Sequence, residues 1–154
     1  MCLIIDTNVF GSVFNKRAKE HTQYAPVIKW LITGNGKMIY GGTKYNDELR
    51  GSLYRRMLAE LARSNSLVKI PSDPVDKYAA DLKVRVPDKA FDDEHIVALV
   101  AISKCCVVCT DDKKSLRYLK RLDLYPRGVN PPKIYKRKSH AKLCCNTHIV
   151  AVCQ

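Results

Sequence analysis

The sequence predicts a three-layer α/β sandwich built around a central, mostly parallel β-sheet. Short apolar runs alternate with stretches in which apolar residues recur every three or four positions, so strands alternate with helices along the chain. The runs are apolar on both sides, which is typical of strands covered by helices on both faces. They are Leu3 to Ile5, Met38 to Tyr40, Leu67 to Ile70 and Cys106 to Cys109.

Amphipathic periodicity and end signals define the helices. We expect Gly34-Asn35-Gly36 to end the second helix, Gly41-Gly42 to close the second strand, and Ser72 or Asp73 to cap the fourth helix. The predicted helices run from Val9 to Phe14, Ala25 to Ile32, Lys44 to Ala62 and about Val75 to Val84, then through Ile96 to Ile102 and through Leu116 to Leu122.

The chain of 154 residues has the size of one domain. We expect a domain over residues 1–136, with a short edge strand at Lys133 to Lys136. Residues 137–154 form an extension that begins basic and ends apolar. The sequence leaves open whether this extension is a further strand, a loose tail or a segment that needs a partner.

The net charge favours a polyanionic partner. Lys and Arg number 27 against 15 Asp and Glu, which gives a formal charge of +12. Basic side chains bind the phosphates of nucleic acids in a salt-dependent manner. The basic residues are dispersed, so solvated helix faces are the simpler alternative, and RNA is the partner that we expect.

No signal peptide and no apolar stretch of membrane-spanning length is present, so we expect a cytoplasmic protein without membrane contact. The seven cysteines are an odd number, and three of them, Cys105, Cys106 and Cys109, lie in or beside a predicted strand. We therefore expect reduced thiols. The Cys and His residues of the tail lack the paired spacing of a zinc site.

Four acidic residues lie at the ends of predicted strands or the starts of predicted helices: Asp6, Glu48, Asp93 and Asp112. In a parallel sheet these positions share one edge, so the four carboxylates are expected to converge. Converging carboxylates repel one another unless a cation neutralises them, and oxygen ligands favour Mg²⁺ or Mn²⁺. The pattern predicts metal-assisted hydrolysis.

Four segments carry a resemblance to the PIN-domain nucleases, a family that includes the VapC-like toxins of toxin-antitoxin pairs. They are Leu3-Ile4-Ile5-Asp6-Thr7-Asn8, Glu48, Asp93-Glu94-His95-Ile96-Val97-Ala98 and Val107-Val108-Cys109-Thr110-Asp111-Asp112. The resemblance covers about Met1 to Tyr135. It implies a PIN-like fold, Mg²⁺ or Mn²⁺ dependence, cleavage of RNA phosphodiesters and a homodimer, with an antitoxin protein as partner if the chain is a toxin.

By this resemblance, Asp6, Asp93 and Asp112 hold the metal, and Glu48 completes the catalytic set by orienting or deprotonating the attacking water. The spacing to Ile96 and to Thr110 selects Asp93 over Asp92 and Asp112 over Asp111. Where many members carry a further acid after the fourth, this chain has Lys113, Lys114 and Ser115, which puts a second metal ion in doubt. The residues expected to support the metal ligands are Thr7, Asn8, Asp92, Thr110, Asp111 and Ser115.

Simpler explanations exist for each of these residues. Any one of the acids could cap a helix or complement its dipole, and Glu48 could pair with an Arg of its own helix. His95 is more typical of packing than of acid catalysis. The expected RNA contacts, which solvated helix faces would equally explain, are Tyr45, Arg50, Lys113 and Lys114.

The sequence thus predicts a metal-dependent endoribonuclease that leaves a 3′-hydroxyl and a 5′-phosphate. The main alternative is a PIN-fold RNA-binding module with little or no activity. A phosphatase with an aspartyl nucleophile is disfavoured, because Asp6-Thr7-Asn8 lacks a second acid two residues after the first.

Overall fold

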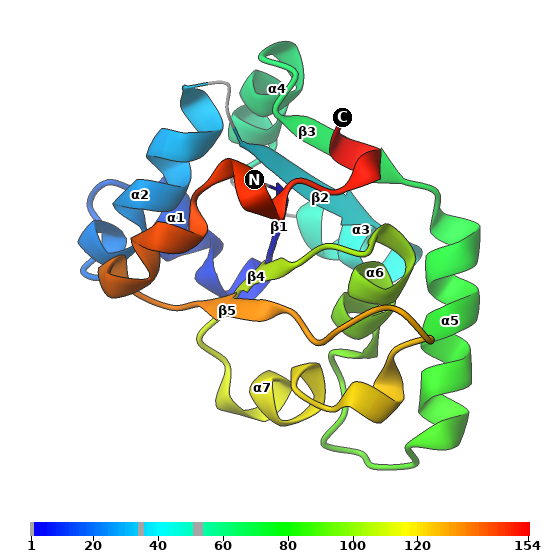
Figure 1. Cartoon of the computed structure of the whole chain (residues 1–154). Helices are drawn as coiled ribbons and strands as arrows, with labels where there is room; N and C mark the ends of the chain where they lie inside the picture. The colour runs from blue at the N-terminus through cyan, green and yellow to red at the C-terminus, as the bar shows by residue number, and fades with distance from the viewer. Residues whose placement is uncertain (1, 34–35, 51–53) are drawn as a thin grey trace.

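The computed structural model describes residues 2–33, 36–50 and 54–154. Within them the chain forms an α/β fold with a five-stranded sheet in the order β3-β2-β1-β4-β5, and every neighbouring pair is parallel (Figure 1). The predicted α/β architecture with a parallel sheet is confirmed. The strands are β1 (Cys2–Ile5), β2 (Lys37–Gly41), β3 (Leu67–Ile70), β4 (Val107–Cys109) and β5 (Lys133–Tyr135).

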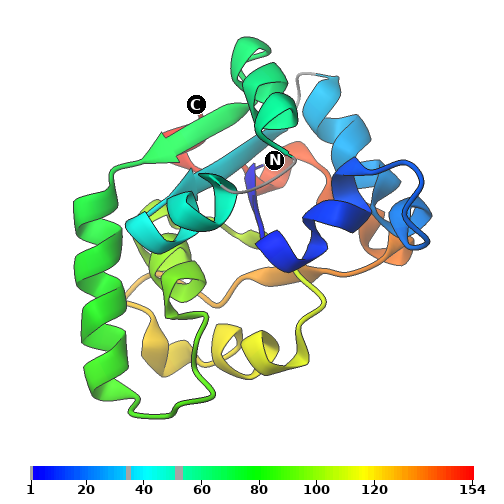
Figure 2. The ribbon, with the colours of Figure 1, turned by 180° about the vertical axis from the view of Figure 1, so that it is seen from behind.

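Helices connect these strands and cover both faces of the sheet. They are α1 (Phe10–Phe14), α2 (His21–Ile32), α3 (Thr43–Arg50), α4 (Arg55–Arg63), α5 (Ser72–Arg85), α6 (Glu94–Ser103) and α7 (Lys113–Leu119). Helix α6 and the C-terminal segment lie on the near side of the sheet in Figure 1, whereas α1 and α4 lie on the far side, which Figure 2 brings to the front. This distribution follows from right-handed crossovers on either side of β1.

The central strand, β1, positions the candidate site. All four of its residues are fully buried, and its register pairs Ile5 with Cys109 of β4. Because the strands are parallel, the residues that follow them, Asp6 and Thr110, meet at one edge of the sheet. After β2, Gly42 adopts a φ of +81°, and a Cβ there would lie 2.7 Å from Val75 Cγ1, so glycine permits the close turn into α3.

The helix predicted from Lys44 to Ala62 is wrong as a single element. Two helices, α3 and α4, take its place, and residues 51–53 between them lie outside the described residues, as do Gly34 and Asn35 of the predicted second-helix end. The predicted capping by Ser72 or Asp73 is also wrong. Helix α5 begins at Ser72 itself, and Pro71 occupies the cap position without a side-chain hydrogen bond.

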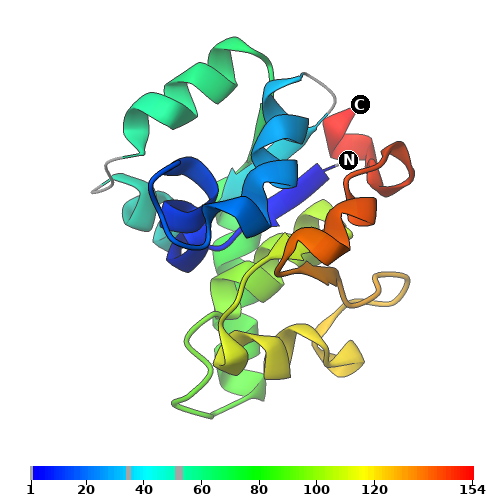
Figure 3. The ribbon, with the colours of Figure 1, turned by 90° about the vertical axis from the view of Figure 1, so that its left-hand side faces the viewer.

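The C-terminal extension packs on the domain as three short 3₁₀ helices (Lys138–Leu143, Asn146–His148 and Ala151–Cys153), so it is neither a loose tail nor an added strand. The first of them lies against α2 and β5, as Figure 3 shows from the side. The backbone N–H of Lys138 donates to Gln23 Oε1 at 3.2 Å, and Tyr135 Oη donates to the Gln23 carbonyl at 3.0 Å.

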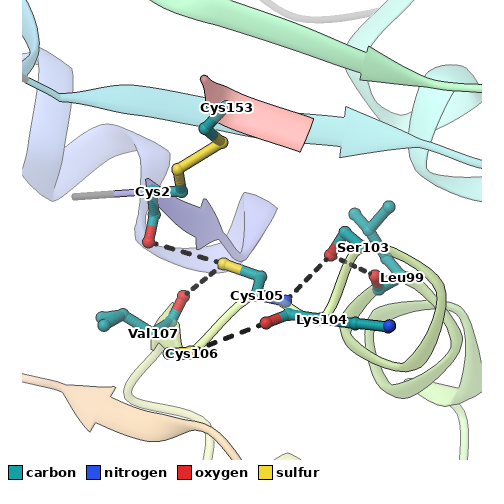
Figure 4. The surroundings of a disulfide bond; sticks show 8 residues. All are labelled: Cys2, Leu99, Ser103, Lys104, Cys105, Cys106, Val107 and Cys153. Carbon is teal, nitrogen blue, oxygen red and sulfur yellow. Dashed lines mark hydrogen bonds between the residues drawn. A yellow bond between two sulfur atoms is a disulfide. The ribbon is translucent and has the colours of Figure 1, made fainter. Parts of the chain in front are cut away.

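A disulfide joins Cys153, at the end of this extension, to Cys2 at the start of β1 (Figure 4). The prediction of reduced thiols is therefore wrong for this pair, which strand burial alone could not have revealed. Cys105 is buried next to it, with its Sγ within 3.5 Å of the Cys2 carbonyl oxygen. No helix of the described segments is long and apolar enough to cross a membrane.

Candidate active site

Asp6 is the buried centre of the candidate site. It is 5% exposed and follows β1, where its Oδ1 accepts the Asn8 backbone N–H at 3.2 Å and so caps the short 3₁₀ helix Thr7–Val9. Its Oδ2 accepts the Thr110 hydroxyl at 2.8 Å. Burial raises the pKa of Asp6, and these two hydrogen bonds partly offset the rise. A carboxylate kept in this environment is poorly solvated.

Thr110 links Asp6 to Asp112. Its buried hydroxyl donates to Asp6 and accepts the Asp112 backbone N–H at 3.1 Å. Asp112 is half-buried, and its Oδ1 accepts the Lys114 backbone N–H at 2.7 Å as the N-cap of α7. Asp111 is exposed. Helix capping thus accounts for one oxygen of Asp112, and its position beside Thr110 brings it to the same edge as Asp6.

Asp93 is the acid that capping does not explain. It precedes α6 without making a side-chain cap bond, and its buried Oδ2 has no hydrogen-bond partner among the described residues. Burial raises the pKa of Asp93 to about 6, and the negative charges of Asp6, Asp92 and Asp112 add to the rise. Asp92 itself is exposed. The charges of Asp6 and Asp112 therefore act on Asp93, and the half-buried Asp93 rather than the exposed Asp92 remains the candidate metal ligand.

Glu48 lies in the last turn of α3, so its predicted place at a helix start is wrong. Its Oε2 accepts the Thr7 hydroxyl at 2.7 Å, and its Oε1 lies 3.4 Å from Nε2 of the buried His95. Burial by itself would raise the pKa of Glu48, but hydrogen bonds from His95 and Thr7 outweigh it and lower the pKa. Arg50, the nearby basic residue of the helix, pairs with Asp47 instead, at 3.1 Å.

The predicted RNA contacts divide into two groups. Tyr45 is fully buried and its hydroxyl donates to the Ile5 carbonyl, so the prediction that it contacts RNA is wrong. Its aromatic ring packs in the core beside His95, which apolar periodicity on α3 could have indicated. Arg50, Lys113 and Lys114 are exposed and remain accessible to a ligand.

Glu94, which the sequence did not single out, is 2% exposed and forms ion pairs with Lys44 at 3.3 Å and Lys83 at 3.0 Å. These residues line an open cavity of about 580 Å³ that also borders Glu48 and His95. One signal was present in the sequence. Glu94 and His95 begin a helix that is otherwise almost entirely apolar, and a charge in such a helix requires a partner.

The candidate carboxylates can be compared with the ligands that a divalent cation requires. Three carboxylates from three segments, Asp6, Asp93 and Asp112, interact electrostatically, and one of their buried oxygens lacks a donor. Oxygen-only donors of this kind fit Mg²⁺ or Mn²⁺. Within the described part of the chain, however, no three His, Cys, Asp or Glu side chains are grouped so that they could hold a metal ion as they stand.

Ser115 and His95 add two further unsatisfied groups near the acids. Ser115 is 1% exposed, and neither its hydroxyl nor His95 Nδ1 has a hydrogen-bond partner among the described residues. Buried polar atoms without partners are uncommon in folded proteins and mark places where a ligand, ion or water supplies the missing contact. Together with Oδ2 of Asp93, these are three buried polar atoms without hydrogen-bond partners among the described residues, and they lie around the starts of α6 and α7.

Comparison with protein-family models, with curated proteins and with solved structures found no match to this chain. The resemblance to PIN-domain nucleases therefore rests on the motif residues of the sequence alone.

Proposed function

We propose that the protein is a metal-dependent endoribonuclease with a PIN-like fold, whose active site is formed by Asp6, Glu48, Asp93 and Asp112. The observation that carries this proposal is the state of Asp93. Its side chain is half-buried, its buried Oδ2 lacks a hydrogen-bond donor among the described residues, and burial and neighbouring acids raise its pKa to about 6. Clustered perturbed acids at the edge of a parallel sheet are typical of catalytic sites.

Asp6, Asp93 and Asp112 would hold one or two Mg²⁺ or Mn²⁺ ions, which lower the pKa of a water, neutralise the phosphate and stabilise the leaving oxygen. Glu48 has a lowered pKa and is ionised at neutral pH, so it accepts a hydrogen bond from the attacking water and can take its proton. Thr7 and His95 fix the carboxylate of Glu48 in place. Thr110 holds Asp6 and the Asp112 backbone together.

The formal charge of +12 supports RNA as the substrate, because exposed basic residues such as Lys113 and Lys114 follow directly on the acidic site. Water rather than the ribose 2′-hydroxyl is the nucleophile in this mechanism. The products should therefore carry a 3′-hydroxyl and a 5′-phosphate.

The first test is cleavage of a mixed, end-labelled RNA by the wild type and by Asp6→Asn in Mn²⁺, in Mg²⁺ and in EDTA, followed by end-group analysis. We expect cutting with Mn²⁺ or Mg²⁺ only, a loss of at least about 100-fold in Asp6→Asn, and 5′-phosphate products. Asp92→Asn is the matched control, because Asp92 is exposed, and it should cut at a rate within a few-fold of the wild type. A 2′,3′-cyclic phosphate product would contradict the mechanism.

The same activity would suit the toxin of a toxin-antitoxin pair, with an antitoxin protein covering the site. In that case, expression of the wild type should arrest growth and Asp6→Asn should not. Tolerance of both at equal protein levels would favour a nuclease without this role.

A second function, that of a PIN-fold RNA-binding module with little or no activity, is favoured by a specific observation. The described acids are not grouped as a ready metal site, and Asp112 already caps α7. Thermal unfolding with and without Mn²⁺ separates the two functions. The nuclease should gain stability from millimolar Mn²⁺ and lose that gain in Asp93→Asn, whereas a binding module should show no gain and should bind RNA equally in EDTA.

A further inference from the structure

A second concave region also borders α3, but none of the four candidate acids lines it. It is a hollow of about 410 Å³ between α3, α4 and the strands β2 and β3. This volume lies within the range of about 300–1,000 Å³ that small-molecule ligands occupy. We call it the α3–α4 hollow; it is lined by Tyr40, Asn46, Leu49, Arg50, Arg55, Leu58, Ala59, Leu67 and Lys69.

The charges of the α3–α4 hollow have one sign. Arg50, Arg55 and Lys69 contribute three cationic side chains from three different elements, and the described residues that line the hollow include no Asp or Glu. All three are exposed. Arg50 pairs with Asp47, which lies outside the hollow, and an exposed pair of this kind is weak enough to exchange for a phosphate. The rim is therefore complementary to an anion.

The floor of the hollow is apolar and carries an aromatic ring. Tyr40 and Leu67 come from adjacent strands, where Tyr40 pairs with Lys69 in the register, and Leu49 and Leu58 close the hollow from α3 and α4. Tyr40 is only half-buried. An aromatic or apolar floor beneath cationic groups is the arrangement with which proteins stack a base and hold its phosphate in single-stranded nucleic acids.

We propose that the α3–α4 hollow binds one nucleotide unit of single-stranded RNA, with the base over Tyr40 and the phosphate at Arg55 and Lys69. This inference rests on the proposed function and adds a substrate subsite to it. Helix α3 connects the hollow with the candidate active site, because Glu48 accepts a hydrogen bond from Thr7, the residue after Asp6, while Leu49 and Arg50 line the hollow. A strand bound there would continue over the last turn of α3 toward Glu48.

The test measures binding without cleavage. A fluorescent single-stranded RNA of about 12 nucleotides is titrated with the full chain in EDTA, and the dissociation constant is followed by anisotropy as salt increases. The variants are Arg55→Glu on α4 and Lys69→Glu on β3, and the matched control is Arg63→Glu, an exposed arginine on α4 that does not line the hollow. Thermal unfolding verifies that each variant is folded.

We expect Arg55→Glu and Lys69→Glu each to weaken binding at least about 10-fold and to reduce the salt dependence, and Arg63→Glu to weaken it less than about 3-fold. Equal losses in all three variants would overturn the subsite in favour of diffuse charge. The subsite would also be overturned if a protein bound to the hollow through Arg55 while RNA stayed bound, because the hollow would then be a protein-binding surface. RNA containing 4-thiouridine should in addition form a photo-crosslink to the peptide that contains Tyr40.

The subsite and the nuclease activity fail separately. If the wild type binds RNA through Arg55 but cuts no RNA with Mn²⁺, the proposed subsite is supported and the proposed nuclease activity is contradicted. If the wild type cuts RNA, and Arg55→Glu binds and cuts RNA as well as Arg63→Glu does, the proposed nuclease activity is supported and the proposed subsite is contradicted.

Discussion

Asp93 should lower the stability of the metal-free protein at neutral pH. Its pKa is about 6 in the folded chain against an ordinary 3.8, so the folded state binds the proton more tightly than the unfolded state. The contribution of Asp93 to stability is therefore fully present below about pH 4 and is lost as the pH rises through about 6. Asp93→Asn removes this penalty and should stabilise the protein at pH 7.5 by about 1–2 kcal/mol, allowing for solvent at this half-buried site.

Urea unfolding in EDTA at pH 7.5 and at pH 4 measures this effect. The gain in Asp93→Asn should nearly disappear at pH 4, and the exposed neighbour Asp92→Asn should gain much less at either pH. A variant that is less stable than the wild type at pH 7.5 would show that the carboxylate makes a favourable contact in the metal-free fold.

The positions of Asp6, Asp93 and Asp112, but not that of Glu48 and not the environments of any of the four, followed from the sequence. Asp6 and Asp112 follow buried strands, which the apolar runs before them indicated. The link through Thr110 and the contact of Glu48 with Thr7 and His95 depend on strand register and on the approach of α3 and α6. Such contacts join residues up to 104 positions apart, and local periodicity carries no information about them.

Helix α7 allows the two roles of Asp112 to be separated. Its carboxylate caps the helix through the Lys114 N–H, and a serine can make the same bond without a charge. Asp112→Ala should lower the free energy of unfolding by about 1 kcal/mol, whereas Asp112→Ser should preserve it. If the carboxylate also holds a metal ion, both variants should lose RNA cleavage.

Denaturant unfolding and the Mn²⁺-dependent cleavage assay, applied to both variants, provide the comparison. Full activity in Asp112→Ser would show that Asp112 caps the helix and has no role in cleavage. Loss of activity in the alanine variant alone would lead to the same conclusion, because activity would then follow helix stability.

At the level of elements, strands were easier to predict than helix ends. The four strands predicted from apolar runs all occur, since fully apolar runs bounded by polar residues leave few alternatives, and the predicted edge strand occurs as β5. The region from Lys44 to Ala62 reads as one helix because leucines continue at helical spacing across it. Separate packing of α3 on β2 and of α4 on β3 divides it, and this tertiary effect places Glu48 in a last turn.

At the scale of the whole fold, Cys2 and Cys153 meet away from Asp6. Cys2 lies at the amino end of β1 and Asp6 follows its carboxyl end, so the disulfide to Cys153 and Asp6 are at opposite ends of this strand. Burial raises the pKa of the neighbouring Cys105 to about 12, so this thiol is protonated at neutral pH and is a poor nucleophile toward the disulfide.

The disulfide should therefore affect stability without affecting catalysis. It closes a loop with a sequence separation of 151 residues, and loops of this length restrict the unfolded chain strongly. Cys153→Ser, or dithiothreitol added to the wild type, should lower the free energy of unfolding by about 2–4 kcal/mol. Dithiothreitol should not change the variant any further.

At temperatures where the wild type and Cys153→Ser are both folded, their rates of RNA cleavage should be the same, because β1 still positions Asp6 through its bonds to β2 and β4. A wild type that is insensitive to dithiothreitol would show that the bridge contributes nothing, and a loss of cleavage in folded Cys153→Ser would show that the C-terminal segment acts on the site through β1.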